Sequence, residues 1–164
     1  MTIKMKWVES CTGIENIIGI NTPAGILTLF RRHDVLIRAE WGSFDNKIAS
    51  NLNELQGHVK HYSLNTNEHV PTKILKQGTP YRQKVWAELC EIPFGETMTY
   101  SELAKKIDSS ARAVGNACRD NPYPFIVPCH RIVSVSGLGG YYGQTQGNLM
   151  AIKAKLLHFE ATHK

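Results

Sequence analysis

The 164-residue sequence predicts an α/β domain over residues 1–75, followed by a mainly helical domain over residues 79–164 that contains a helix-turn-helix. Three observations support this fold class. Strand-like apolar runs and turns fill the first half, capped helices with apolar faces fill the second half, and a polar stretch without periodicity separates them over residues 63–78. The chain is long enough to bury one sizeable core or two small ones.

The composition is typical of a folded globular protein. Hydrophobic residues make up 42% of the chain and charged residues 20%, far from the balance that keeps chains disordered. No apolar run is long enough to span a membrane, and the N-terminus lacks the apolar stretch of a signal peptide, so we expect a cytoplasmic protein. The net charge of +5 suits a polyanionic partner but does not identify one.

The first domain is expected to be a small sheet that carries one helix. Residues 17–20 and 26–30 are apolar runs on either side of a turn-rich connector at 21–25, which predicts a hairpin. Residues 35–41 supply a third strand. Apolar residues then recur at helical spacing over residues 48–62, which predicts the helix.

Three helices are expected to open the second domain. Thr79 is a good N-cap for a helix that Pro93 stops, a capping box at 99–102 opens a second helix, and Ser110 can cap a third over residues 111–119. The short second and third helices, with a tight turn between them, predict a helix-turn-helix. Such a unit can lay its second helix in a DNA groove, but the same geometry occurs in plain protein cores, and the pattern alone leaves both open.

The sharpest chemical signal is Cys129 beside His130, in an apolar run over residues 126–133. An imidazole base can convert a thiol into a nucleophilic thiolate. A buried structural cysteine is the alternative. Because adjacent residues of a strand point to opposite faces, a direct bond between these side chains would require a turn or a bridging water. The four cysteines contain no C-x-x-C pair, so neither a disulfide framework nor a zinc ribbon is expected.

Several motifs of this half occur together and in order. Residues 128–132 (PCHRI), 112–117 (RAVGNA), 121–122 (NP), 92–97 (IPFGET) and 99–100 (TY) resemble the O6-alkylguanine-DNA alkyltransferase family. The resemblance covers essentially all of residues 78–160, whereas the first 75 or so residues fit the family's N-terminal domain only in length and strand content. It implies a ribonuclease-H-like N-terminal domain and a winged-helix-like C-terminal domain.

The resemblance implies a DNA repair reaction. An O6-alkylguanine base, mainly O6-methylguanine, would be flipped out of duplex DNA, and its alkyl group would move irreversibly to Cys129. By the same resemblance His130 takes the thiol proton through a water, Glu160 orients that imidazole, and Asn121 fixes the turn around the site. One molecule would repair one lesion, as a monomer and without a cofactor. A soft, strong thiolate nucleophile suits displacement at an alkyl carbon.

The resemblance also assigns the contacts with DNA. Tyr100 would assist rotation of the nucleotide and hydrogen-bond the extruded guanine, and Arg112 would fill the vacated stack. Extrusion costs on the order of a few kcal/mol, so the gap needs an occupant. The small residues Ala113 and Gly115 would let the helix approach the minor groove closely. A solvated surface charge is the alternative for Arg112.

The pocket for the alkyl group is the least secure part of the resemblance. The residues expected to form it are Pro128, Ile132, Tyr142 and Gly143. Residues 144–148 depart from the family pattern and border this pocket, and residues 107–110 are shorter than usual. Glu160 lies near the end of an apolar-periodic helix, where the pattern alone favours a surface carboxylate.

Other candidate residues and other function classes fit the sequence less well. His58, His61 and His69 could bind a metal, but no nearby carboxylate or cysteine completes a ligand set, so no metal site is expected. Cys118 is expected to be a small packing residue. A helix-turn-helix regulator without catalysis would have no need of the Cys129–His130 pair. A cysteine hydrolase would use that pair but would turn over many times.

Overall fold

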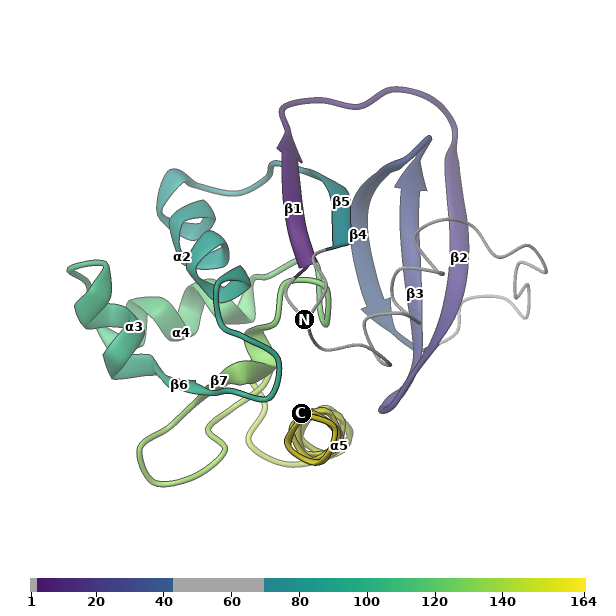
Figure 1. Ribbon diagram of the computed structural model, residues 1–164. Coiled ribbons are helices and arrows are strands. Elements are labelled where there is room, and N and C mark those ends of the chain that lie inside the picture. Colours follow the sequence, from purple (N-terminus) through teal and green to yellow (C-terminus); the bar gives the residue numbers. More distant parts are fainter. Residues whose placement is uncertain (1–2, 43–69) are drawn as a thin grey trace. The chain divides into compact units, whose positions relative to one another are not determined.

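The computed structural model describes residues 3–42 and 70–164, and the chain divides into two compact units, Met1–Gln77 and Gly78–Lys164 (Figure 1). One predicted helix and the candidate metal ligands lie outside the described residues: 48–62, His58, His61 and His69. Within the described ranges, no helix is long and apolar enough to cross a membrane.

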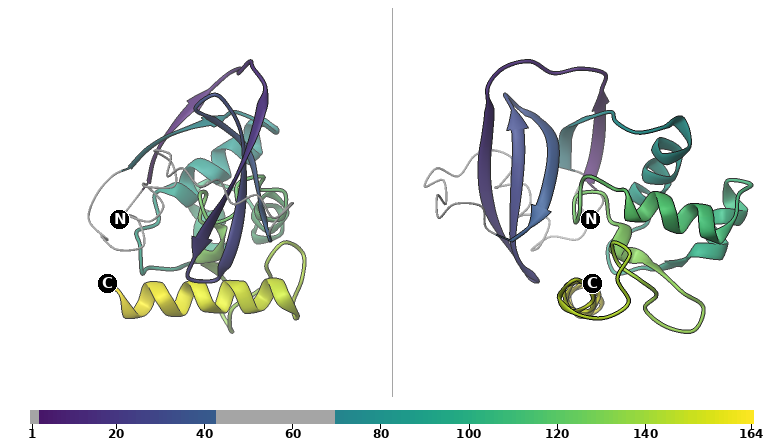
Figure 2. Two further views of the ribbon diagram at one scale, coloured as in Figure 1. Left: turned by 90° about the vertical axis from the view of Figure 1, so that its right-hand side faces the viewer. Right: turned by 180° about the vertical axis from the view of Figure 1, so that it is seen from behind.

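A five-stranded sheet forms the described part of the first unit, with the strand order β1-β5-β4-β3-β2 (Figures 1 and 2). The strands are β1 (Ile3–Val8), β2 (Glu15–Thr22), β3 (Gly25–Arg32), β4 (Val35–Trp41) and β5 (Val70–Leu75). β2, β3 and β4 are antiparallel, which confirms the predicted hairpin and third strand. β5 was not predicted, and it runs parallel to both β1 and β4.

Burial in this sheet follows the alternation of its side chains. Ile18 and Ile20 of β2 are buried, Gly19 between them is half-buried, and Ile17 and Asn21 on either side are exposed, the pattern of a strand with one covered face. In β3, residues 27–30 are buried without a break. The hydroxyl of Thr28, which belongs to this run, donates a hydrogen bond to the Gly42 carbonyl at 2.6 Å, so the buried polar group is satisfied.

The second unit is mainly helical, and the three predicted helices are confirmed as α2, α3 and α4. Its elements are α2 (Pro80–Cys90), β6 (Met98–Thr99), α3 (Tyr100–Lys106), α4 (Ala111–Arg119), the 3-10 helix η1 (Cys129–Arg131), β7 (Ile132–Val133) and α5 (Asn148–Thr162). A mixed sheet in the first unit and helices in the second therefore give the chain an α/β fold.

Each of the three helices begins at the cap that the sequence indicates. The Thr79 and Ser110 hydroxyls each accept a hydrogen bond from the backbone N–H three residues later. Thr99 and Glu102 form a complete capping box, because the Glu102 carboxylate also accepts from the Thr99 backbone N–H at 2.7 Å. Such caps stabilise a helix by about 1 kcal/mol each, and here they fix where α2, α3 and α4 start.

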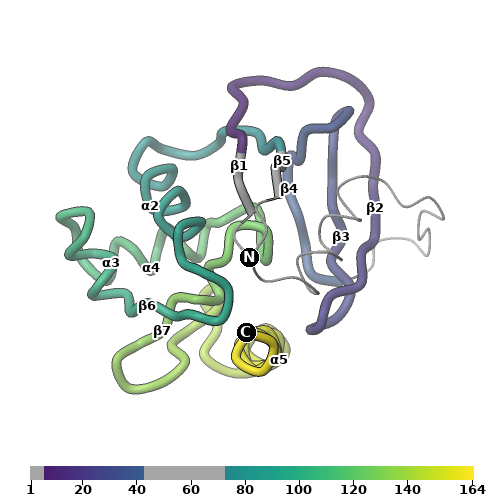
Figure 3. The backbone as a smooth tube through the Cα atoms, in the orientation of Figure 1, coloured from purple at the N-terminus to yellow at the C-terminus, as the bar shows by residue number. Residues whose placement is uncertain are grey.

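Two contacts position the elements of the second unit. The buried Trp86 of α2 donates from its indole N–H to the Ala117 carbonyl of α4 at 2.8 Å, which ties these helices together. β6 and β7 pair in parallel, with Met98 opposite Ile132 (Figure 3). Because the pair is parallel, α3, which begins at Tyr100, leaves one end of it, and η1, which begins at Cys129, leads into the other end.

Candidate active site

Cys129 lies on a tight turn. Residues 129–131 form the short 3-10 helix η1, capped by Pro128, whose carbonyl accepts the Arg131 N–H at 3.0 Å. With three residues per turn, adjacent side chains of such a helix point about 120° apart, not to opposite faces as in a strand. The turn that a direct bond between Cys129 and His130 would require is therefore present, but no hydrogen bond joins the two side chains: Nε2 pairs with Glu160 and Nδ1 has no partner among the described residues.

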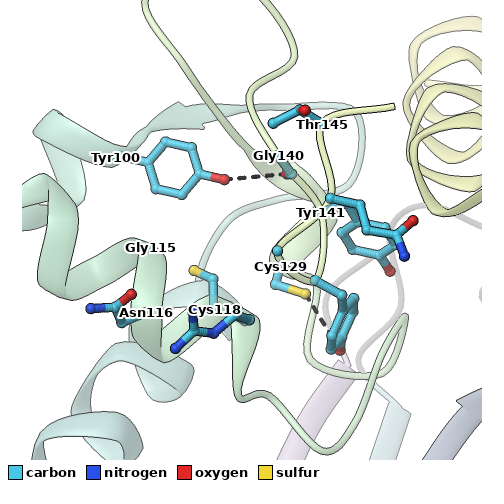
Figure 4. A pocket seen from close by; sticks show the side chains of 12 residues that line it. Tyr100, Gly115, Asn116, Cys118, Cys129, Gly140, Tyr141 and Thr145 are labelled. Atoms are coloured by element: carbon cyan, nitrogen blue, oxygen red, sulfur yellow. Dashed lines mark hydrogen bonds between the residues drawn. The ribbon is translucent and has the colours of Figure 1, made fainter. Parts of the chain in front are cut away.

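The Cys129 sulfur is enclosed by two polar neighbours, and its residue is only 3% exposed. The Asn121 side-chain amide donates to the sulfur at 3.3 Å and to the Val127 carbonyl at 3.0 Å. The thiol lies 3.7 Å from the Tyr142 hydroxyl, which donates to the Asn121 carbonyl at 2.9 Å (Figure 4). Asn121 is thus held by several bonds and aims an N–H at the sulfur.

Burial raises the pKa of the Cys129 thiol, because an anion loses hydration inside the protein. The hydrogen bond from Asn121, the hydrogen bond between the thiol and Tyr142, and the charge of Lys153 act to lower this pKa, but they do not outweigh burial. The resting sulfur is therefore a neutral thiol. A nucleophilic thiolate must be formed by a nearby base.

His130 is the neighbouring base, and its orientation is fixed by Glu160. The His130 Nε2 lies 2.8 Å from the Glu160 carboxylate, and both side chains are almost fully buried. Burial alone would raise the pKa of Glu160, but His130 and Arg131 outweigh burial and lower it to about 2. Because an ionised carboxylate only accepts hydrogen bonds, Nε2 carries the imidazole proton. Nδ1 then has the free lone pair, and it is buried with no hydrogen-bond partner among the described residues.

Arg131 and Lys153 are buried cations of this region that sequence reasoning missed. Arg131 binds both Glu160 oxygens, at 2.9 and 3.0 Å, and the Ile92 carbonyl at 2.7 Å. Lys153 of α5 donates to the Ile132 and Gly140 carbonyls. The sequence does contain a signal for Arg131: it is a charged residue inside an apolar run, and such a residue must be paired when the run is buried. Glu160, which the helix pattern alone places at the surface, is its partner.

A cavity of about 230 Å³ opens beside the Cys129 sulfur (Figure 4). Tyr142 and Gly143 line it, as expected from the sequence. Pro128 and Ile132 do not line it, because both are buried around η1, where Pro128 caps the turn and Ile132 begins β7. The other lining residues are Tyr100, Gly115, Asn116, Cys118, Arg119, Gly140, Tyr141, Gln144 and Thr145.

A two-residue turn presents Tyr142 to the cavity. Tyr142 and Gly143 have φ of +50° and +77°, and the flanking Tyr141 and Gln144 exchange both backbone hydrogen bonds, at 2.9 and 3.0 Å. Two left-handed residues at the centre of a hairpin turn favour glycine at the second position. A side chain there would also meet the Arg119 Cδ at 3.1 Å. The residues that depart from the family pattern begin directly after this turn, and Gln144 lines the cavity.

The opposite side of the cavity is formed by Tyr100 and helix α4. The Tyr100 hydroxyl donates to the Gly140 carbonyl at 3.3 Å, and burial raises its pKa to about 12, so it stays a neutral donor. Gly115 lies next to the Tyr100 ring, and Cys118, expected only to pack, also lines the cavity. Arg112 and Ala113 lie in the first turn of α4, with Arg112 exposed and without an ion pair among the described residues.

Comparisons with known proteins agree with these features. Residues 80–162 match the family model described as 6-O-methylguanine DNA methyltransferase, DNA binding domain. The constitutive methylated-DNA–protein-cysteine methyltransferase of Bacillus subtilis is 32% identical over 85% of this chain and 91% of its own length. A probable methylated-DNA–protein-cysteine methyltransferase of Acanthamoeba polyphaga mimivirus is 44% identical over 60% of this chain and 68% of its own length.

Solved structures agree as well. The Mycobacterium tuberculosis OGT in complex with DNA superposes with a TM-score of 0.72 at 30% identity, covering 90% of this chain and 93% of that one. The O6-methylguanine methyltransferase of the same organism gives 0.69 at 30% identity, over 92% and 95%. These matches confirm the resemblance found in the sequence motifs. The chain therefore belongs to the 6-O-methylguanine DNA methyltransferase family.

Proposed function

We propose that Cys129 is the cysteine to which this chain transfers the alkyl group of an O6-alkylguanine in DNA, mainly O6-methylguanine. DNA repair by alkyl transfer to a protein cysteine is the activity of the family. One observation carries the choice of Cys129: its sulfur receives an N–H bond from Asn121, borders the cavity, and neighbours an imidazole held by Glu160. Each of the other three cysteines lacks this combination among the described residues.

The proposed reaction starts with a proton transfer. The Nδ1 of His130 takes the thiol proton through a water, and the ionised Glu160 stabilises the imidazolium that forms. Asn121 donates to the sulfur as its charge grows. The thiolate then attacks the alkyl carbon, an S–C bond forms and the C–O6 bond breaks. The guanine ring takes up the proton that His130 had received from the thiol, so guanine leaves neutral and the imidazole returns to its neutral form. The thioether carries no leaving group that the site could expel, so one molecule repairs one lesion.

Recognition requires that the base leave the duplex. The Tyr100 hydroxyl, bound to Gly140 in the free protein, is available to assist the rotation and to donate to the extruded guanine. The exposed Arg112 is free to fill the vacated stack. Ala113 and Gly115 keep the α4 backbone open to close approach, which fits a minor groove rather than reading of base edges in the major groove.

The architecture of this proposal follows the family. Helices α3 and α4 act as a helix-turn-helix in a winged-helix-like domain, beside a ribonuclease-H-like first domain, and the protein acts as a monomer. Backbone groups near Cys129, Ile132 and Gly143 recognise the edges of the purine, although the Ile132 carbonyl is already bound by Lys153. Pro128 and Ile132 therefore flank the acceptor turn at its two ends and do not contact the alkyl group.

The test is intact-mass analysis after mixing the protein with a duplex that contains one O6-methylguanine, followed by peptide mapping. We expect a gain of one methyl group per molecule, on Cys129. Cys129→Ser should abolish transfer and keep DNA binding, because an alcohol is a far poorer nucleophile of nearly the same size. Cys118→Ser is the matched control on the same cavity and should retain transfer.

Three results would contradict the proposal. A methyl group on Cys118 or Cys90 would move the acceptor. DNA binding with no mass change would indicate a regulator without catalysis. Repeated turnover with the thiol unmodified would indicate a hydrolase.

A further inference from the structure

Lys153 is a buried cation without an anionic partner. Its residue is fully buried, and its ammonium donates to the Ile132 carbonyl at 2.5 Å and to the Gly140 carbonyl at 2.9 Å. No carboxylate pairs with it anywhere in the described ranges. A buried charge is costly unless it is paired, so an isolated ammonium here calls for an explanation.

The two carbonyls that Lys153 binds belong to the two walls of the acceptor site. Ile132 follows the turn that holds Cys129, and Gly140 lies on the cavity and also accepts the Tyr100 hydroxyl. The Lys153 ammonium lies 6.0 Å from the centre of the Tyr100 ring, which also attracts a cation. Lys153 therefore connects α5 to both walls at once.

The other charges near the acceptor are already balanced. Arg131 offsets Glu160 through two short bonds, and His130 becomes positive only when it takes the thiol proton. The groups that face Lys153 electrostatically are the two thiols of the cavity, Cys129 and Cys118, with the Tyr100 ring beside them. Of these, the Cys129 sulfur is the one that must become an anion during the reaction.

We propose that the Lys153 ammonium is the counter-charge of the Cys129 thiolate, and that it acts as a positioning residue by clamping the acceptor turn to the loop at Gly140. When the thiol gives its proton to His130, a negative charge forms on the sulfur. The Lys153 ammonium already supplies a positive charge in the same site, and no carboxylate among the described residues pairs with it. The mutual effects on the two pKa values agree with this coupling, because the charge of Lys153 acts to lower the pKa of Cys129. Burial lowers the pKa of Lys153 to about 8, and the thiols act to raise it.

The test measures the thiol itself, without DNA. Iodoacetamide reacts with thiolate and not with thiol, so its rate at the Cys129 peptide as a function of pH reports the pKa of that thiol. Loss of an opposite charge nearby shifts a pKa by about one unit or more, so Lys153→Met should lower the rate at neutral pH by about tenfold and move the profile to higher pH. Lys153→Gln, which removes the charge but keeps N–H donors, should do the same.

Two variants separate charge from packing. Lys153→Arg keeps the charge and should stay closer to the wild type than either neutral variant. Lys155→Met makes the same change at an exposed position of α5 and should leave the profile unchanged. A folded Lys153→Met or Lys153→Gln variant with the wild-type profile would overturn the proposal, because a purely structural clamp does not move the pKa of the thiol.

If neither neutral variant folds, the pH profile of the wild-type iodoacetamide rate tests the coupling between Cys129 and Lys153. A thiol coupled to Lys153 titrates more broadly than a single ionisation, because the ionisation of each group depends on the charge of the other. A profile that fits one independent ionisation would then refute the coupling. The inference rests on Cys129 being the acceptor, but the two can fail separately, since the iodoacetamide rate is measured without repair and peptide mapping after repair does not depend on Lys153.

Discussion

Glu160→Gln removes one charge from the buried group that holds the His130 imidazole. The substitution keeps the size of the side chain, but an amide has only one acceptor oxygen for two donors, the Arg131 guanidinium and the His130 N–H. In the wild type the carboxylate binds the Arg131 guanidinium at 2.9 and 3.0 Å and the His130 Nε2 at 2.8 Å. After the change Arg131 loses the buried carboxylate that balances its charge.

Two independent arguments give the size of the effect. Removal of one partner of a buried ion pair destabilises a protein by about 3–5 kcal/mol. The pKa of Glu160 falls from its usual 4.5 to about 2 in the folded chain, which corresponds to about 3 kcal/mol of stabilisation of the ionised form. Because the folded-state pKa is the lower one, this stability is present above pH 4.5 and is lost as the pH falls toward 2.

The assay is urea unfolding at several pH values. Unfolding is monitored by hydrogen exchange of the α2 amides, so that the signal reports the second unit. We expect Glu160→Gln to be less stable by about 3 kcal/mol at neutral pH, with the difference shrinking as the wild-type carboxylate takes up its proton. Glu96→Gln is the matched control at an exposed position. A neutral-pH difference below about 1 kcal/mol, or a difference that persists undiminished in acid, would refute the reasoning.

Two further substitutions test recognition. Arg112→Ala should slow repair of duplex DNA by about tenfold or more but hardly affect reaction with free O6-methylguanine base, because only the duplex requires a flipped base; equal slowing in single-turnover assays of both substrates would make Arg112 structural. Gln144→Gly should raise the ratio of benzyl to methyl transfer rates, with the methyl rate little changed, because a side chain on the cavity hinders the larger group first. An unchanged or lower ratio would show that Gln144 does not narrow the pocket.

Local signals were enough to predict the helices of the second unit. The hydroxyl caps at Thr79, Thr99 and Ser110 each satisfy an N–H that would otherwise lack a partner, and this requirement acts within four residues of the helix start. The hairpin of β2 and β3 was found for the same reason, since its turn and its apolar runs are adjacent in sequence. The predicted helix over residues 48–62 stays a prediction.

Contacts between residues far apart in the sequence could not be predicted from such local signals. β5 joins the sheet by lying parallel to β1 and β4, and a parallel partner can come from anywhere in the chain. Lys153 and Glu160 lie on a helix whose pattern does not distinguish a solvated charge from a buried one. The partners of these charges lie elsewhere in the chain: His130 and Arg131 of the acceptor turn bind Glu160, and the carbonyls of Ile132 and Gly140 bind Lys153.

The raised pKa of Cys129 is consistent with a protein that reacts only once. An exposed thiolate is alkylated and oxidised by any small electrophile, and each such event would inactivate a molecule that cannot regenerate its thiol. A buried, neutral thiol reacts more slowly with these reagents, because only its small thiolate fraction is nucleophilic. In the proposed mechanism His130 takes the proton and the charge of Lys153 stabilises the thiolate that then attacks the alkyl carbon. Selectivity then depends on what enters the cavity beside Tyr142, not on a permanently reactive sulfur.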